Sequence, residues 1–279
     1  MTRRLNGISK SANWLGGSIL LIAMLIAGCE KTPAAREDAA NPPPAQPPTP
    51  VEWPAESWSK SPPAQWPQFV LTNETAFRGH TALHGASAFL FEAGNHRLYA
   101  ATANHLLGEN GGVKPEIGRP MLDSVLQGWR LFPRTQPAKK LTASGWASQS
   151  PAAPGNDWLI LQLGELPKEL PATPLHLRNT PVRVGETVYL IGVPYAEPDR
   201  AQNVYVGKVT ARNARNTRFR YDITPPVDIS GFSGAPIVDE HGLVVGVMTV
   251  WFEPKMQGEK MLEAGGEDAT SIATIFNLP

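Results

Sequence analysis

The sequence predicts an all-β fold, and three observations support this prediction. Short runs rich in Val, Ile, Leu and aromatic residues recur along the chain from residue 69 onward, as expected of half-buried strands. Clusters of Gly, Pro, Asn or Asp separate these runs, and such residues favour tight turns. Only two stretches favour helix, residues 121–128 and 270–277. About 210 residues of this kind suit two small barrels or one large sandwich.

Eight runs are expected to form strands because each combines β-branched or aromatic residues with turn-forming neighbours. They are residues 86–91, 98–102, 158–163, 187–192, 203–210, 218–223, 235–238 and 243–251. Residues 94–95 and 240–242 are typical of hairpin turns. Thr270 is expected to cap the C-terminal helix. The charged, Gly-rich residues 255–267 are expected to form an exposed loop before that helix.

The N-terminal residues have the layout of a secretory signal peptide. Three basic residues precede an uncharged apolar run over residues 14–28, which is shorter than the ~20 residues that a bilayer span needs. The run ends in Ile-Ala-Gly-Cys29, which resembles the bacterial lipobox, where the peptide is cut before a cysteine that receives lipid. The resemblance implies a lipoprotein signal peptide at residues 1–28 and lipidation of Cys29. The alternative is an uncleaved signal anchor with an incidental cysteine.

This interpretation predicts a lipid-anchored protein of the bacterial cell envelope, on the periplasmic face of the outer or inner membrane. By analogy, Glu30 after the cysteine favours the outer membrane over the inner one. Residues 29–68 are expected to be a Pro-rich tether, because 11 of the 39 residues from Glu30 to Gln68 are proline. The three tryptophans of this region, Trp53, Trp58 and Trp66, are expected to dock onto the domain that follows.

Composition excludes several classes of function. The chain carries 25 basic and 25 acidic residues, so its net charge of zero argues against a basic nucleic-acid binder. A single cysteine excludes an intrachain disulfide and a Cys-based zinc or iron–sulfur site. No nucleotide-binding fingerprint is present, and His80, His84 and His96 are not spaced as metal ligands. We therefore expect no cofactor and no metal.

The most informative segment is Gly-Phe-Ser-Gly-Ala-Pro, from Gly231 to Pro236. Glycines on both sides of Ser233 allow a tight turn that points backbone N–H groups inward. The amides of Gly231 and Ser233 would then form an oxyanion hole. The alternative is an ordinary Gly/Ser turn.

Two further segments carry residues suited to activating a serine. His105 stands at the exit of the run 98–102, and Asp157 stands just before the run 158–163. Taken singly, each also fits a structural histidine or an aspartate at a strand start. Asp123 competes with Asp157, but no strand of the expected pattern follows it.

Together these segments resemble the chymotrypsin-like (trypsin-fold) serine proteases, over roughly residues 83–277. Thr-Ala-Asn-His105 resembles the family's Thr-Ala-Ala-His, and the other two motifs resemble Asp-Ile-Ala-Leu-Leu and Gly-Asp-Ser-Gly-Gly-Pro. The resemblance implies two antiparallel six-stranded β-barrels over residues 69–279, with a short C-terminal helix. It implies a serine endopeptidase that acts on protein or peptide substrates through an acyl-enzyme, with Ser233 as nucleophile, His105 as base and Asp157 orienting the histidine. The alternative is an inactive trypsin-fold scaffold that binds peptides or envelope proteins.

Two departures from the family pattern stand near these motifs. Phe232 replaces the aspartate that receives the new N-terminus in animal digestive enzymes, which implies that no such activation occurs here. Asn104 replaces an alanine beside the histidine, where it either adds a hydrogen bond or faces solvent.

Alignment with the family places the primary pocket at a set of five residues. Its base falls at Val227, and its wall at Thr249, Val250 and Trp251. A bulky Trp251 favours small or medium apolar substrate side chains. A shift of one residue in this alignment would instead place Asp228 at the base of the pocket and reverse the preference for apolar substrate side chains.

Overall fold

The computed structural model describes residues 53–94, 96–147, 156–215, 217–249 and 252–276. The candidates Cys29, Val250 and Trp251 lie outside these residues.

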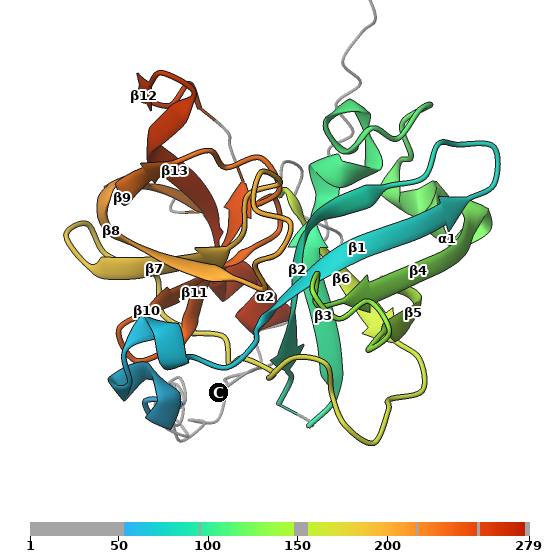
Figure 1. Ribbon diagram of the computed structural model, residues 1–279, viewed down its shortest axis with the longest axis horizontal. Helices are drawn as coiled ribbons and strands as arrows, with labels where there is room; N and C mark the ends of the chain where they lie inside the picture. The colour runs from blue at the N-terminus through green and yellow to red at the C-terminus, as the bar shows by residue number, and fades with distance from the viewer. Residues whose placement is uncertain (1–52, 95, 148–155, 216, 250–251, 277–279) are drawn as a thin grey trace, which may run out of the picture. The chain divides into compact units, whose positions relative to one another are not determined.

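Six antiparallel strands close into an N-terminal barrel (Figure 1). Their order around the barrel is β1-β2-β3-β6-β5-β4, and β1 also pairs with β4. The strands are β1 (Val70–Phe77), β2 (His84–Glu92), β3 (Leu98–Ala103), β4 (Leu126–Phe132), β5 (Leu141–Trp146) and β6 (Trp158–Leu163).

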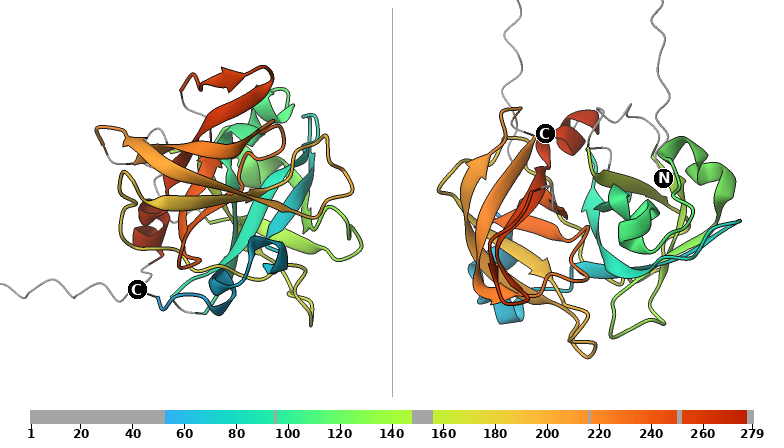
Figure 2. Two further views of the ribbon diagram at one scale, coloured as in Figure 1. Left: turned by 60° about the vertical axis from the view of Figure 1, so that its left-hand side comes forward. Right: turned by 90° about the horizontal axis from the view of Figure 1, so that it is seen from above.

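A second antiparallel barrel follows in the chain. Its order is β11-β10-β7-β8-β9-β13, and a pairing between β11 and β13 closes it, while β12 extends β13 as a hairpin. The strands are β7 (Thr187–Gly192), β8 (Asn203–Arg212), β9 (Arg218–Val227), β10 (Pro236–Asp239), β11 (Val244–Thr249), β12 (Met256–Gln257) and β13 (Lys260–Asp268). The two barrels lie side by side in Figure 1 and in the right-hand view of Figure 2. The prediction of two six-stranded antiparallel barrels is confirmed.

The helices are short. Those of the described residues are α1 (Leu122–Val125), α2 (Thr270–Ile275) and the 3-10 turns η1 (Ser57–Lys60), η2 (Pro63–Gln65), η3 (Asn104–Leu107), η4 (Glu109–Gly111) and η5 (Arg119–Met121). The C-terminal helix is confirmed as α2, although Asp268 rather than Thr270 accepts the N–H of its first turn. The helix expected at residues 121–128 is one turn long because the chain enters β4 at Leu126. None of these helices has the length and apolar character needed to cross a bilayer.

The expectation of an exposed loop over residues 255–267 is wrong. These residues form the β12–β13 hairpin, and β13 pairs with both β9 and β11. A Cβ on Gly266 would lie 2.8 Å from the ring of Phe219, so this glycine leaves room for a core side chain. Its presence is a packing requirement of the strand.

Three apolar clusters stabilise the fold, and one of them joins the barrels. That cluster takes residues from both barrels and from α2, including Phe89, Phe91, Ile160, Ile191, Val247 and Ile272. The other two fill the interiors of the N-terminal and C-terminal barrels. The relative position of the two barrels is therefore fixed by burial of apolar surface.

Part of the segment expected to be a tether belongs to the folded structure. Trp66 is 8% exposed and packs against Trp58 and Tyr189, with ring centroids 4.8 and 5.3 Å apart. Trp58 in turn contacts Phe69 at 4.5 Å. The folded part of the chain thus begins before residue 69, and the expected docking of these tryptophans is observed.

Replacing Trp66 tests this packing. Trp66→Ala removes a buried aromatic side chain from the shared cluster, so it should lower the free energy of unfolding by about 3–5 kcal/mol. Trp53→Ala is the control, because Trp53 stacks on the half-buried His176 at 4.1 Å and lies outside the shared cluster. Denaturant unfolding of both variants measures the difference. Equal losses would contradict a role of Trp66 in the core.

Candidate active site

Strand pairing brings His105 and Asp157 together. The end of β3 lies beside the start of β6, with Ala103 opposite Trp158. His105 lies in η3 directly after β3, and Asp157 directly precedes β6. Ser233 comes from the other barrel, in the turn between β9 and β10. The three residues that the motifs singled out therefore converge where the barrels meet.

A continuous set of contacts links these three side chains. The two carboxylate oxygens of Asp157 accept the backbone N–H of His105 at 2.7 Å and its Nδ1 at 2.6 Å. The Nε2 atom of the same ring lies 2.9 Å from Ser233 Oγ. The side chains of His105 and Asp157 are 21% and 20% exposed, so the pair is shielded but reachable from solvent. The backbone N–H of His105 holds the Asp157 carboxylate in place, and rotation of the ring would break its Nδ1 contact with that carboxylate.

The turn over residues 231–234 (the serine loop) is hydrogen-bonded to strand β2 of the N-terminal barrel. The N–H of Ser87 donates to the carbonyl of Ser233 at 2.9 Å, and Ser87 Oγ donates to the carbonyl of Gly231 at 2.7 Å. A Cβ on Gly234 would lie 2.2 Å from the carbonyl oxygen of Ser87, and Gly234 has φ +88°. This position requires glycine both for its conformation and for the close approach of the two backbones.

The backbone around Ser233 leaves two amides without a protein acceptor among the described residues. Gly231 has φ +102°, and the N–H of Tyr195 donates to the carbonyl of Ser230 at 2.9 Å. In a trans peptide the carbonyl and the following N–H point in opposite directions, so this bond directs the Gly231 N–H away from Tyr195. Within the part of the chain that the structure describes, the amides of Gly231 and Ser233 donate to no other residue.

Apolar packing holds this loop on the side of the C-terminal barrel. Phe232 is fully buried in the barrel interior and meets Tyr205 edge-to-face at 5.6 Å. A Cβ on Gly192 would lie 2.3 Å from the Phe232 ring. Glycine at position 192 therefore leaves the space that this ring occupies. Phe232, which stands where the family has an aspartate, thus holds the loop by packing in the barrel core.

Sequence reasoning missed Arg119, which joins the segments carrying His105 and Asp157. Its Nε donates to Asn104 Oδ1 at 2.6 Å, and one of its terminal nitrogens donates to the carbonyls of Asn156 (2.8 Å) and Trp158. Burial lowers the pKa of Arg119, and the negative charge of Asp157 opposes this shift. Asn104, beside the histidine, therefore makes a hydrogen bond and is not simply turned to solvent.

Sequence reasoning also missed Glu267 on β13. Its carboxylate forms an ion pair with Arg218 on β9 at 2.7 Å. Burial raises the pKa of Glu267 and the nearby charge of Asp157 adds to this shift, while the hydrogen bond and charge of Arg218 oppose it. Both missed residues lie far from the triad motifs in sequence, and neither stands in a recognisable pattern.

The residues proposed for the primary pocket occupy different environments. Val227 ends β9 and is buried in the interior of the C-terminal barrel, and Thr249 is buried at the end of β11. Asp228 is half-buried, and its carboxylate accepts the N–H of Ser230 at 2.9 Å. The remaining two candidates are outside the described residues.

The competing candidates lie elsewhere. Asp123 is exposed in α1, whereas Asp157 contacts His105. His84 and His96 are exposed, and His80 bonds a backbone carbonyl. Across the described ranges, no group of three His, Cys, Asp or Glu residues is arranged to hold a metal ion.

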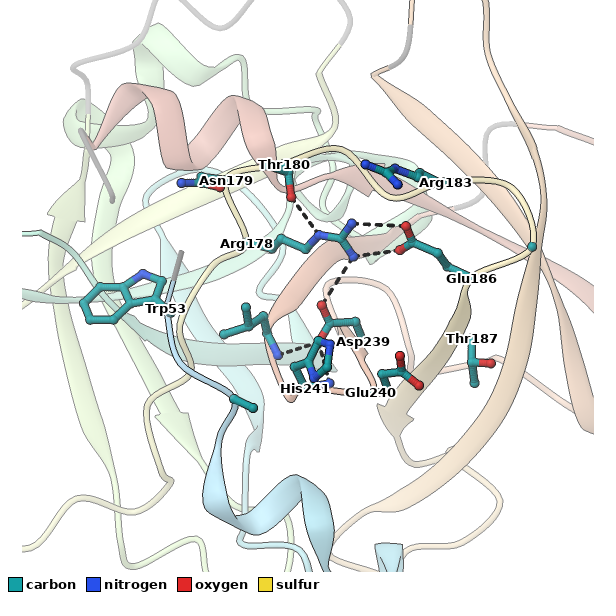
Figure 3. A pocket seen from close by; sticks show the side chains of 13 residues that line it. Trp53, Arg178, Asn179, Thr180, Arg183, Glu186, Thr187, Asp239, Glu240 and His241 are labelled. Carbon is teal, nitrogen blue, oxygen red and sulfur yellow. Dashed lines mark hydrogen bonds and ion pairs between the residues drawn. The ribbon is translucent and has the colours of Figure 1, made fainter. Parts of the chain in front are cut away.

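A separate pocket of about 620 Å³ lies between the N-terminal segment and the C-terminal barrel (Figure 3). In it, Arg178 forms ion pairs with Glu186 at 2.7 Å and Asp239 at 3.3 Å. Trp53 lies on the opposite side of Arg178 from Glu186. The pocket contains none of the three converging residues.

Comparisons with solved structures returned proteases of low sequence identity. The Rv3671c protease in an inactive form is 15% identical, over 75% of this chain and 88% of that one, with a TM-score of 0.47. An inactive mutant of Rv3671c from M. tuberculosis H37Rv is 15% identical over 82% of this chain and 95% of that one, with the same TM-score of 0.47. The serine endoprotease from Yersinia pestis is 17% identical over 75% of this chain, which spans 61% of that chain, again with a TM-score of 0.47.

Among curated proteins, no sequence matches this chain. The family model described as a trypsin-like peptidase domain matches residues 86–247, which is more than half of the sequence. The chain belongs to the trypsin-like peptidase domain family.

Proposed function

We propose that this chain is a serine endopeptidase that hydrolyses peptide bonds through an acyl-enzyme and is anchored by lipid in the bacterial envelope. The observation that carries the proposal is the unbroken contact from Asp157 through His105 to Ser233, at 2.6 and 2.9 Å. Membership of the trypsin-like peptidase family supports it.

Each residue has a distinct part in the proposed reaction. Asp157 accepts a hydrogen bond from Nδ1 of His105, which selects the tautomer whose Nε2 accepts the proton of Ser233 Oγ. The oxygen then attacks the substrate carbonyl, and the amides of Gly231 and Ser233 stabilise the resulting oxyanion. His105 returns its proton to the leaving amine, and water later hydrolyses the acyl-enzyme with His105 again as base.

We further propose an apolar primary pocket. The carboxylate of Asp228 is tied to the N–H of Ser230 at 2.9 Å, which favours a structural part in the turn over a charged pocket base. Val227 is then the nearer candidate for the base. A preference for small or medium apolar side chains follows, with Thr249, Val250 and Trp251 as the proposed wall.

The proposed anchor is a lipid on Cys29, with residues 1–28 removed as a signal peptide. The apolar run before the only cysteine supports it. Docking of Trp58 and Trp66 onto the barrels would leave the residues between Cys29 and Trp53 as the tether to the membrane.

The proposed catalytic unit can be tested residue by residue. Ser233→Ala or His105→Ala should lower kcat by about 10⁶-fold, because the two residues act together. Asp157→Asn should cost about 10⁴-fold, since it removes orientation but not the nucleophile. Asp123→Asn is the matched control and should retain activity. The measurements are steady-state cleavage of a peptide library and labelling by an active-site serine probe.

A different result would assign the chain to another class. Loss of activity in Asp123→Asn but not in Asp157→Asn would mean that the third residue is misassigned. A purified, folded protein that neither cleaves the library nor reacts with the probe between about pH 6 and pH 9, where a histidine base is expected to act, would favour the inactive scaffold.

The anchor has its own test. Cys29→Ser should leave a longer precursor that is not lipidated, because the mutant hydroxyl cannot form the thioether. Immunoblotting of membrane and soluble fractions and mass spectrometry of the N-terminus measure this outcome. Unchanged processing and unchanged membrane fractionation would contradict the lipobox interpretation.

A further inference from the structure

Strand β2 contains a bulge directly before Ser87, the residue that bonds to the serine loop. The pairing of β1 with β2 joins Thr72 to Ser87, and the next pair joins Asn73 to Gly85. Ala86 is therefore the extra residue of a bulge. It has φ +56°, a conformation that is uncommon for a residue with a side chain. Such a conformation persists where the surrounding structure holds it.

The side chain of Tyr195 reaches this bulge from the other barrel, where Tyr195 lies in the loop between β7 and β8. Its hydroxyl oxygen accepts the N–H of Ala86 at 2.6 Å. A Cβ on Gly85 would lie 2.6 Å from the same oxygen, and a Cβ on Gly231 would lie 3.1 Å from the ring. The phenol is therefore closely packed against one glycine of each barrel.

A second contact holds the same loop. Arg134, in the turn between β4 and β5 of the N-terminal barrel, donates from Nη1 to the carbonyl of Pro194 at 2.7 Å. Its guanidinium carbon lies 5.5 Å from the centre of the Tyr195 ring, within the range of a cation–π contact. The N-terminal barrel thus holds the β7–β8 loop at two points, one on the backbone and one on the phenol.

The backbone of Tyr195 connects these contacts to the serine loop. Its N–H donates to the carbonyl of Ser230 at 2.9 Å, so the N–H of the Ser230–Gly231 peptide is directed the opposite way. Gly231 has φ +102°, and the conformational freedom of a glycine would allow this peptide to rotate. The bond from Tyr195 restricts that rotation.

We propose that Tyr195 and Arg134 are positioning residues that fix the orientation of the Ser230–Gly231 peptide, and with it the first amide of the proposed oxyanion hole. The inference rests on the proposed function, because it assigns that amide a part in catalysis. Within the described structure neither side chain bonds to the three residues of the proposed triad, so their influence passes through this peptide.

The structure offers a matched control for each residue. Tyr189→Phe removes a hydroxyl from β7, the strand before this loop, where the ring packs against Trp66. Arg200→Ala removes an arginine from the same loop, and this arginine pairs with Glu197 at 4.0 Å. Tyr195 itself is 49% exposed, and substitutions outside the core usually change stability little. An effect on catalysis can therefore be separated from an effect on folding.

The first experiment measures kcat and KM for peptide cleavage by the full-length chain and its variants. Tyr195→Ala should lower kcat by about 100-fold with little change in KM, because the loss of an oxyanion donor has costs of this size. Tyr195→Phe and Arg134→Ala should each lower kcat by about 10-fold, since each removes one hydrogen bond that holds the loop. Tyr189→Phe and Arg200→Ala should keep the wild-type kcat.

The second experiment needs no turnover. Amide hydrogen exchange at residue 195, followed by NMR, reports the bond from this N–H to the Ser230 carbonyl. Exchange should become about 10-fold faster in Tyr195→Phe and in Arg134→Ala, because each loses one hydrogen bond that holds the loop. It should stay unchanged in the two controls. Thermal unfolding of each variant verifies that it is folded.

The outcomes separate this proposal from the proposed function. Wild-type kcat in Tyr195→Ala would overturn the positioning role, and so would equal losses in the two controls. A rise in KM without a fall in kcat would also overturn it, because Tyr195 would then contribute to substrate binding and not to the transition state.

If the wild-type chain does not react with a serine probe, the proposed function fails, and hydrogen exchange alone decides the role of Tyr195. Faster exchange in Tyr195→Phe then supports the proposal that the phenol fixes this peptide. Unchanged exchange overturns it.

Discussion

The hydrogen bond from the N–H of Ser87 to the carbonyl of Ser233 joins the two barrels at the site, and the geometry of the site depends on it. His105 and Asp157 belong to one barrel and Ser233 to the other, so the 2.9 Å contact between imidazole and hydroxyl exists only while the barrels keep their relative position. The shared apolar cluster supplies the energy that holds the barrels together. Burial of apolar surface has no preferred direction, whereas hydrogen bonds require specific distances and angles. The bonds from Ser87 therefore fix the position of the serine loop relative to β2.

Buried charge plays a second organising part. Strand β13 carries two consecutive carboxylates, Glu267 and Asp268, and each pairs with an arginine of the same barrel, Arg218 on β9 and Arg212 on β8. Consecutive residues of a strand point to opposite faces. The two carboxylates therefore lie on opposite faces of β13, and that of Asp268 accepts the N–H of Thr270 at the start of α2.

The sequence allowed the active-site geometry to be anticipated because its three residues stand at strand ends with local signatures. Strands rich in large apolar or β-branched residues, such as β6 and β7, were predicted with their observed bounds. Strand β1 was missed because it contains polar residues that are buried in the structure. Asn73, for example, is fully buried and accepts the indole N–H of Trp129 at 3.0 Å. A buried polar residue whose hydrogen-bond partner is distant in the sequence cannot be distinguished from an exposed polar residue by its neighbours in the chain.

Strand β13 was missed for a related reason. Its glycines and carboxylates are typical of loops, yet Gly266 makes room for Phe219 and the carboxylates have arginine partners. These partners are known only once the strands are paired. Arg119 is similar, since a single arginine in a short turn gives no sign that it bonds to two distant segments of the chain.

The burial of Phe232 has a consequence for when the serine loop takes its shape. In a digestive enzyme of the family the serine loop is completed by an ion pair that forms only after the chain is cut. Here the corresponding side chain is part of the barrel interior, next to Gly192 and Tyr205. The loop therefore acquires its shape as the barrel folds, without an ion pair that depends on cleavage of the chain. The order in which the barrel packs, and not a later cut in the chain, thus sets the shape of the loop that carries Ser233.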